Sequence, residues 1–211
     1  MTAFFTHCWR KFSLIALGLL LTTLAPLAQA QGISVERAEM LPVENGWHIN
    51  ADFKFNLSKE VEEAVNKGVA LHFLVEFVLM EPNKYWFDQE AASASLPIKL
   101  SYHALSRQYL VNSGTRQANF TSLQEAMDEI GKLRAWEVHE KDALKKDTPY
   151  YAMLRMRLDQ NKLPKPIQVS ALGSEQWNLI SDRHRWTPNL DRTEKADKAD
   201  RAPEKPEKPE K

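Results

Sequence analysis

The 211-residue chain carries 28 basic and 28 acidic residues, so its formal net charge is +0 and no broad positive field would attract nucleic acid or anionic lipid. Hydrophobic residues make up 43% of the chain and charged residues 27%, as in an ordinary globular protein. We therefore expect one or two folded domains and no nucleic-acid partner.

The chain begins with the three-part order of a secretory signal peptide. A basic pair at residues 10–11 precedes an uncharged apolar run over residues 12–28, and an Ala-x-Ala site ends at Ala30. Cleavage there would leave Gln31 as the new terminus. An uncleaved anchor is the alternative, but the run is shorter than the roughly 20 residues that a spanning helix needs. The pattern predicts a signal peptide over residues 1–30, export to the periplasm of a Gram-negative bacterium, and no stable membrane span after cleavage.

Cys8 is the only cysteine, and it lies inside the predicted signal peptide. Its removal would leave no thiol, which excludes disulfides, cysteine nucleophiles and thiolate zinc sites from the exported protein. Residues 31–190 therefore have to fold without cross-links. Their length is sufficient for a self-supporting hydrophobic core.

Alternation of apolar and polar residues dominates residues 31–190 and predicts β-strands. Residues 46–57 show it best, because Trp47, Ile49 and Phe53 share one face with every second residue between them. An Asn-Gly pair at the start of this segment is a strong hairpin signal. Further strands are predicted over residues 33–43, 71–80, 96–103, 107–113, 134–140, 148–159 and 165–172, and residues 177–186 read as a short strand or a helical turn.

Helical spacing occurs in only two segments. Residues 58–68 begin with a capping Ser58, carry acids in the first turn and end at Gly68, and residues 121–133 repeat apolar residues along one stripe. Many short strands with two short amphipathic helices predict a mainly β domain: an antiparallel β-sandwich, immunoglobulin-like in general architecture. A curled sheet with helices on one face is the alternative fold.

The apolar stretch over residues 71–80 carries one histidine and one glutamate, His72 and Glu76. On a strand they share a face but lie about 13 Å apart, which is too far for a catalytic pair or for shared metal ligation. A membrane span is excluded for this stretch because Glu76 and Glu81 interrupt it. We expect a central strand, whose mixed face around His72 and Glu76 is a place for a small ligand.

Three aromatic residues, Tyr85, Trp86 and Phe87, follow this stretch in or near a loop. Their rings could fold back into the core, as large aromatic side chains usually do. They could instead form an exposed contact patch, because Tyr and Trp are enriched in binding hot spots. Both interpretations stay open, and Tyr85, Trp86 and Phe87 are the candidate binding residues.

Motifs of the familiar enzyme classes are absent from the sequence. It has no Gly-x-Ser-x-Gly elbow, no His-Glu-x-x-His pair and no glycine-rich phosphate loop. The histidines of the predicted exported part are scattered singly, and no pair of carboxylates stands out for acid–base work. We predict a protein that is not an enzyme, with no catalytic residue, metal site or cofactor. An enzyme assembled from distant residues, such as a cryptic hydrolase, is the remaining alternative.

The last segment, residues 191–211, consists almost entirely of charged residues, Ala and Pro, and it closes with three Pro-Glu-Lys units. It has too little apolar surface to offset the entropy of ordering, so we expect a disordered, solubilising tail. The predicted organisation is a signal peptide over residues 1–30, a single β-rich domain over residues 31–190, and this tail.

Five segments in a fixed order look like those of one bacterial family: GISVERAEM, ALHFLVEFVLMEPNKYWFD, LSYHALSRQYLV, LPKPIQVSAL and WNLISDRHRW. On them the chain, over residues 32–186, resembles the exported proteins of domain of unknown function 4390 (DUF4390). That family has no established activity, catalytic residue or cofactor. The resemblance implies a proteobacterial exported protein, whose genes often lie beside those of a nitrogen-type sensor kinase and its response regulator.

These observations favour a non-enzymatic binding module of the cell envelope. Its expected partner is another envelope protein, with the extracytoplasmic part of a sensor kinase as one candidate, and the expected contact is the aromatic segment. A small-ligand or cell-wall-binding domain is the alternative, and a cryptic hydrolase is the third hypothesis.

Overall fold

The computed structural model describes residues 32–43, 46–139, 144 and 148–190. The predicted signal peptide, its cleavage site at Ala30 and Gln31, the predicted tail and part of the Asn-Gly turn lie outside the described residues, so the three-part organisation of the chain stays a prediction. Among the described helices, none is both long and apolar enough to cross a bilayer.

Two antiparallel sheets form most of the described domain. The first has the strand order β1–β2–β7 and the second has the order β6–β5–β4–β3–β8–β9. Every neighbouring pair runs antiparallel, which confirms the prediction of a mainly antiparallel β protein. The three-stranded sheet contains β1 (Gly32–Val43), β2 (Gly46–Asn56) and β7 (Lys132–His139); the six-stranded sheet contains β3 (Leu71–Glu81), β4 (Gln89–His103), β5 (Gln108–Ser113), β6 (Arg116–Phe120), β8 (Tyr151–Leu158) and β9 (His184–Trp186).

The two sheets face each other across one hydrophobic core. Every second residue of β3 from Leu71 to Leu79 is buried, and β8 shows the same alternation. Rings from the two sheets meet in this core: Phe55 lies 5.6 Å from Phe73, and Phe77 lies 6.5 Å from Trp136, both with edge-to-face geometry. This is a two-layer arrangement of sheets. The finer prediction, an immunoglobulin-like architecture, stays a prediction.

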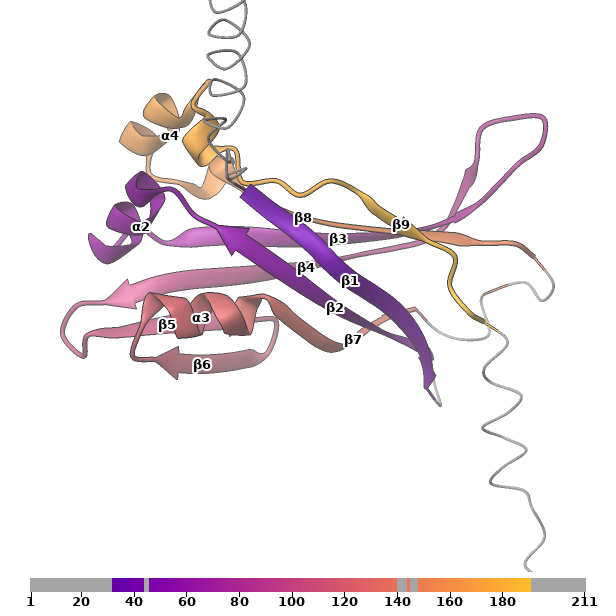
Figure 1. Ribbon diagram of the computed structural model, residues 1–211, viewed down its shortest axis with the longest axis horizontal. Coiled ribbons are helices and arrows are strands. Elements are labelled where there is room, and N and C mark those ends of the chain that lie inside the picture. The colour runs from indigo at the N-terminus through magenta and orange to yellow at the C-terminus, as the bar shows by residue number, and fades with distance from the viewer. Residues whose placement is uncertain (1–31, 44–45, 140–143, 145–147, 191–211) are drawn as a thin grey trace, which may run out of the picture. The chain divides into compact units, whose positions relative to one another are not determined.

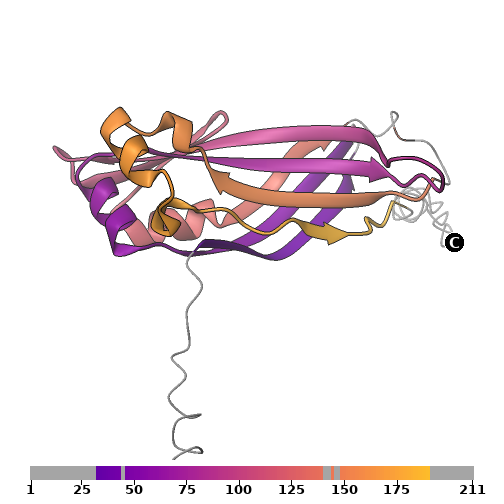
Figure 2. The same cartoon turned by 90° about the horizontal axis from the view of Figure 1, so that it is seen from above.

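The helices and the β3–β4 connection lie at opposite ends of the sheets. Figure 1 shows α2 and α4 at one end, while the connection between β3 and β4 turns away from the sheet at the other end. Figure 2 shows the strands as two layers, again with the helices gathered at one end. The β3–β4 connection is therefore remote from the helices.

Both predicted helices are present. Helix α2 (Lys59–Asn66) begins after Ser58, whose hydroxyl accepts a hydrogen bond from the backbone N–H of Val61. Helix α3 (Leu123–Ile130) begins after Ser122, which caps the helix in the same way. Each cap satisfies a backbone N–H that has no partner inside the helix.

A third helix, α4 (Lys165–Ala171), corrects the prediction of two helices and of a strand over residues 165–172. Pro166 sits in its first turn, where a missing N–H costs nothing. Ile167 and Ala171 pack against the core while lying four residues apart, which is helical and not strand spacing. Two short 3-10 helices, η2 (Gln160–Lys162) and η3 (Glu175–Trp177), lie on either side of α4.

Two strands depart from the prediction. β4 begins at Gln89 instead of residue 96, because its small, polar first half pairs with the strongly apolar β3 along its length. β6 was missing from the prediction, because its residues show little apolar character. In the segment over residues 177–186 the short strand is present as β9, while the helical turn η3 precedes the segment and overlaps it only at Trp177.

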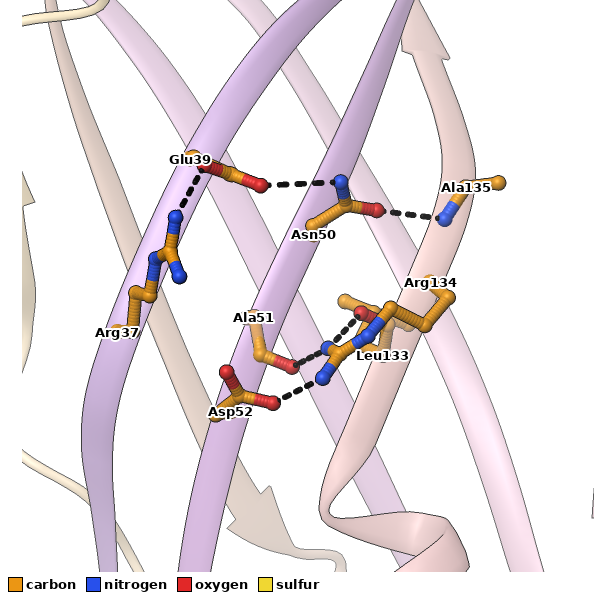
Figure 3. A network of polar contacts seen from close by, with 8 residues as sticks. All are labelled: Arg37, Glu39, Asn50, Ala51, Asp52, Leu133, Arg134 and Ala135. Carbon is orange, nitrogen blue, oxygen red and sulfur yellow. Dashed lines mark hydrogen bonds and ion pairs between the residues drawn. The ribbon is translucent and has the colours of Figure 1, made fainter.

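Polar side chains on the three-stranded sheet repair an irregularity in the β2–β7 ladder (Figure 3). Ala135 adopts a positive φ of 51°, and the side-chain oxygen of Asn50 accepts its N–H at 2.8 Å. The amide of Asn50 also donates to Glu39 at 3.2 Å. The guanidinium of Arg134 reaches the carbonyl oxygens of Ala51 and Leu133 and the carboxylate of Asp52. These groups supply the bonds that the ladder lacks, so we assign this network a structural role.

Candidate functional site

The segment over residues 82–88, between β3 and β4, is the aromatic loop. The exposed fractions of its three rings are 81% for Tyr85, 80% for Trp86 and 92% for Phe87. The interpretation that these rings fold back into the core is therefore wrong. Their exposure is a property of the structure, whereas their role in binding stays a prediction.

Hydrogen bonds tie the backbone of the aromatic loop to the sheet. The carboxylate of Asp88 accepts the N–H of Asn83 at 3.0 Å, and the side-chain oxygen of Asn83 accepts the N–H of Tyr85 at 3.1 Å. The hydroxyl of Tyr151, on β8, donates to Asp88 at 2.6 Å, and the guanidinium carbon of Arg185 lies 3.5 Å from the centre of the Tyr151 ring. The loop is anchored through Asp88 while its rings point into solvent.

The electrostatics of this anchor agree with its geometry. The hydrogen bonds from the Tyr151 hydroxyl and from the Asn83 N–H hold the pKa of Asp88 below its ordinary value. The same bond to Asp88 raises the pKa of Tyr151, because it favours the protonated phenol. Asp88 is therefore a carboxylate, and Tyr151 a phenol, throughout the neutral pH range.

A groove of about 600 Å³ lies on the outer face of the six-stranded sheet, and we call it the outer groove. Val78, Met80 and Met153 contribute apolar side chains, and the small side chains of Ser93 and Ser95 leave room beside them. Both serines are exposed, so no other element of the described chain covers this part of β4.

The outer groove adjoins the aromatic loop. Met80 and Glu90 line the groove and pair with each other across β3 and β4, and the connection between these two strands carries the loop. The loop and the groove therefore form one continuous surface.

A cluster of charges borders the outer groove on the side of β8 and β9. The carboxylate of Glu76 accepts a hydrogen bond from Arg155 at 2.5 Å and two from Arg157 at 3.2 Å. Although burial alone would raise it, these bonds hold the pKa of Glu76 below its ordinary value. Arg183 lines the groove beside Arg155 and makes no ion pair with a described residue.

The strand spacing predicted that His72 and Glu76 are too far apart to act as a catalytic pair, and the structure agrees, whereas binding of a small ligand on the mixed face around them stays a prediction. Both lie on the outer face of β3, four residues apart, as expected for a strand. Glu76 is bound to two guanidinium groups, so its carboxylate is committed as an ion-pair partner. Burial and the charges of Lys162 and Lys99 lower the pKa of His72, which favours a neutral imidazole.

The described residues hold no group of three or more His, Cys, Asp or Glu side chains that could bind a metal ion together. Against known proteins, residues 30–187 match the family model described as a domain of unknown function, DUF4390. The chain belongs to the DUF4390 family. No curated protein and no solved structure matches it. The resemblance found in the sequence is confirmed, and the function of this DUF4390 domain has to be argued from its own surface.

Sequence reasoning placed the aromatic loop of the DUF4390 domain but missed the arginines beside it. Arg155 and Arg157 alternate with the buried residues of β8, and Arg183 and Arg185 alternate across the start of β9. Two basic residues at every second position of a strand indicate a basic stripe on its open face. That signal was present, but only the pairing of β8 with β9 brings the two stripes together.

Proposed function

We propose that this DUF4390 domain is an exported, non-enzymatic binding module of the cell envelope that holds another envelope protein through its aromatic loop. The observation that carries the proposal is the exposure of Tyr85, Trp86 and Phe87. Each aromatic side chain can bury about 150–250 Å² against a partner. Tyr and Trp are also the residues that most often dominate binding energy.

The anchored backbone of the loop supports the same role. Binding costs less free energy when the contact residues are already held in place, because less conformational freedom is lost. Asp88 provides this restraint through its bonds to Asn83 and Tyr151. A turn that only connects two strands does not require three large aromatic side chains. Clusters of exposed apolar residues on soluble proteins mark contact sites.

The compartment and the partner are part of the proposal. The apolar N-terminal run and the Ala-x-Ala site ending at Ala30 support export. The gene neighbourhood implied by the family resemblance makes the extracytoplasmic part of a sensor kinase the first partner to test.

The test is capture of an envelope protein from detergent extract by the tagged full-length chain. Replacing Tyr85, Trp86 and Phe87 together by alanine should abolish capture and change the free energy of unfolding by less than about 1 kcal/mol, because exposed side chains add little to stability. The control is Leu105→Ala, which removes an equally exposed apolar side chain (93%) at the other end of β4. Undiminished capture by the triple variant, or its unfolding, contradicts the proposal.

A cavity between the two sheets favours a second candidate function, binding of a small ligand. It measures about 370 Å³, and its lining includes Leu96, Ile98 and Val111 on one side and Ile130 and Trp136 on the other. This volume is within the range of ligand sites, about 300–1,000 Å³. A ligand that binds there should raise the melting temperature of the wild type but not of a Val111→Trp variant, in which the cavity is filled.

The non-enzymatic part of the proposal has its own test. A broad screen of ester and peptide substrates should show no turnover by the purified full-length chain above that of a boiled sample. Reproducible turnover that follows the folded protein through purification would instead favour the cryptic hydrolase.

A further inference from the structure

The geometry points to the outer groove as the docking site for an acidic, extended segment of the partner protein. This inference rests on the proposed function, because the aromatic loop and the outer groove form one surface. It adds the chemistry of the partner: carboxylates for the basic side of the groove and apolar side chains for its floor.

Charge is distributed unevenly across the outer groove. On the β4 side, Ser93 and Ser95 are neutral and the one carboxylate, Glu90, lies opposite Met80 at the end next to the aromatic loop, whereas arginines border the side of β8 and β9. Arg155 is bound to Glu76, but Arg183 makes no ion pair with a described residue. Leu154 pairs with His184, and the residues next to them, Arg155 and Arg183, both line the outer groove. Glu76 is already shared between Arg155 and Arg157, so the guanidinium of Arg183 is left as a site for a second carboxylate.

The spacing of the groove residues determines which sequence of acidic and apolar residues in a partner segment would fit the groove. Glu76, Val78 and Met80 follow one another on the outer face of β3, at intervals of about 7 Å. A partner segment in an extended conformation has the same repeat on each of its faces. An acidic residue beside Arg155 and Arg183 is then followed, at alternate positions, by two apolar residues over Val78 and Met80. The far end of such a segment meets the aromatic loop.

The other available occupants do not match this charge. Residues 191–211 contain seven acidic and seven basic residues, so the chain's own C-terminal segment has no excess of carboxylates. A two-fold interface joins two copies of the same surface, so a second copy docking through this face would bring its own Arg183 and no excess of carboxylates. A different chain with an acidic segment avoids both problems.

Labelled peptides test the inference by fluorescence anisotropy with the purified full-length chain. The probe is a serine peptide with Glu, Leu and Leu at alternate positions, and its controls are the same residues in scrambled order and a version with Lys in place of Glu. We expect saturable binding of the probe and at least about tenfold weaker binding of both controls, which corresponds to about 1.4 kcal/mol. Arg183→Glu should weaken probe binding by about tenfold or more, because a charge at a contact is reversed.

Arg116→Glu is the matched variant, since it makes the same change of charge on the same sheet. Arg116 pairs with Ser113, which pairs with the buried Ile98, so it belongs to the opposite face from the outer groove. It should leave probe binding unchanged. Equal binding to the Arg183→Glu and wild-type chains, or no preference among the three peptides, overturns the inference.

Two further outcomes also overturn it. The first is tighter binding of a labelled peptide of residues 191–211 than of the probe, which would make the chain's own C-terminal segment the occupant. The second is a wild-type dimer that dissociates in the Arg183→Glu variant. The peptides test only the outer groove. The proposed function is tested separately, by the capture experiment with the triple alanine variant of the aromatic loop.

Discussion

Aromatic residues are buried at one place along the β3–β4 hairpin and exposed at another. Phe77, in the middle of β3, is 1% exposed and packs between Trp136 and Trp186, whereas Trp86, nine residues later, is 80% exposed. Apolar character is the same in both places. The difference is that Phe77 lies on the inner face of a paired strand, while the aromatic loop extends past the sheet. Hydrophobicity alone therefore does not distinguish a core residue from a contact residue; the position on the sheet does.

Phe77→Ala should give the largest effect, at the buried end of the comparison. Removing a fully buried ring leaves a cavity and costs about 3–5 kcal/mol of unfolding free energy. Denaturant titration followed by circular dichroism measures it. A loss below about 1 kcal/mol would mean that Phe77 is not part of a packed core.

Glu76→Gln should give an intermediate effect, because Glu76 lies on the outer face of the same strand with its side chain 23% exposed. The substitution leaves Arg155 and Arg157 without their shared carboxylate, and we expect a loss of about 1–2 kcal/mol, between the values for exposed and buried ion pairs. Glu63→Gln is the control, since its pair with Lys67 is exposed and should change stability by less than about 0.5 kcal/mol. Equal effects of both substitutions would show that the arginine pair does not depend on Glu76.

The pH dependence of stability sharpens this result. The pKa of Glu76 is lower in the folded chain than its ordinary value of 4.5. Its stabilisation is therefore fully present above pH 4.5 and is lost as the pH falls through the lower, folded pKa. The difference in unfolding free energy between wild type and Glu76→Gln should be constant from pH 7 to about 5 and shrink below that. A difference that grows on acidification would contradict the assigned direction. The lowered pKa of His72 reduces stability at pH values below 6.5, the ordinary pKa of histidine. This effect is present in both chains, so it cancels in the difference.

Trp86→Ala should give the smallest effect on stability, at the exposed end of the comparison. Nothing in the described core loses a contact, so the unfolding free energy should change by less than about 0.5 kcal/mol. The same denaturant titration measures it. A loss comparable to that of Phe77→Ala would show that Trp86 is buried in solution.

The sequence predicted the strands and helices whose residues alone carry a clear apolar periodicity or capping signal. Alternation identified β3 and β8, a capping serine identified α2, and a helically spaced apolar stripe identified α3. Helix α4 was read as a strand, because the contact of Ile167 and Ala171 with the core was not visible in the sequence. The first half of β4 was missed because its pairing depends on β3 and not on its own residues.

The candidate site, like the fold, was predicted only in part. Tyr85, Trp86 and Phe87 were found from their residue types, but their exposure depends on how the hairpin leaves the sheet. The β3 side of the outer groove belongs to the mixed face that the sequence indicated, but its arginines were not predicted, because Arg155 and Arg183 belong to separate segments. Only the register between β8 and β9 makes them neighbours. Contacts set by strand register are non-local, and the sequence of one segment does not contain them.

The central claim is that the aromatic loop is a contact surface. Its most direct test is photo-crosslinking in cells from a photo-reactive residue at position 86, with position 105 as the equally exposed control at the other end of β4. We predict one dominant envelope protein joined at position 86 and none at position 105. A folded, exported chain that gives no specific adduct at position 86, or the same adducts at both positions, would contradict the claim.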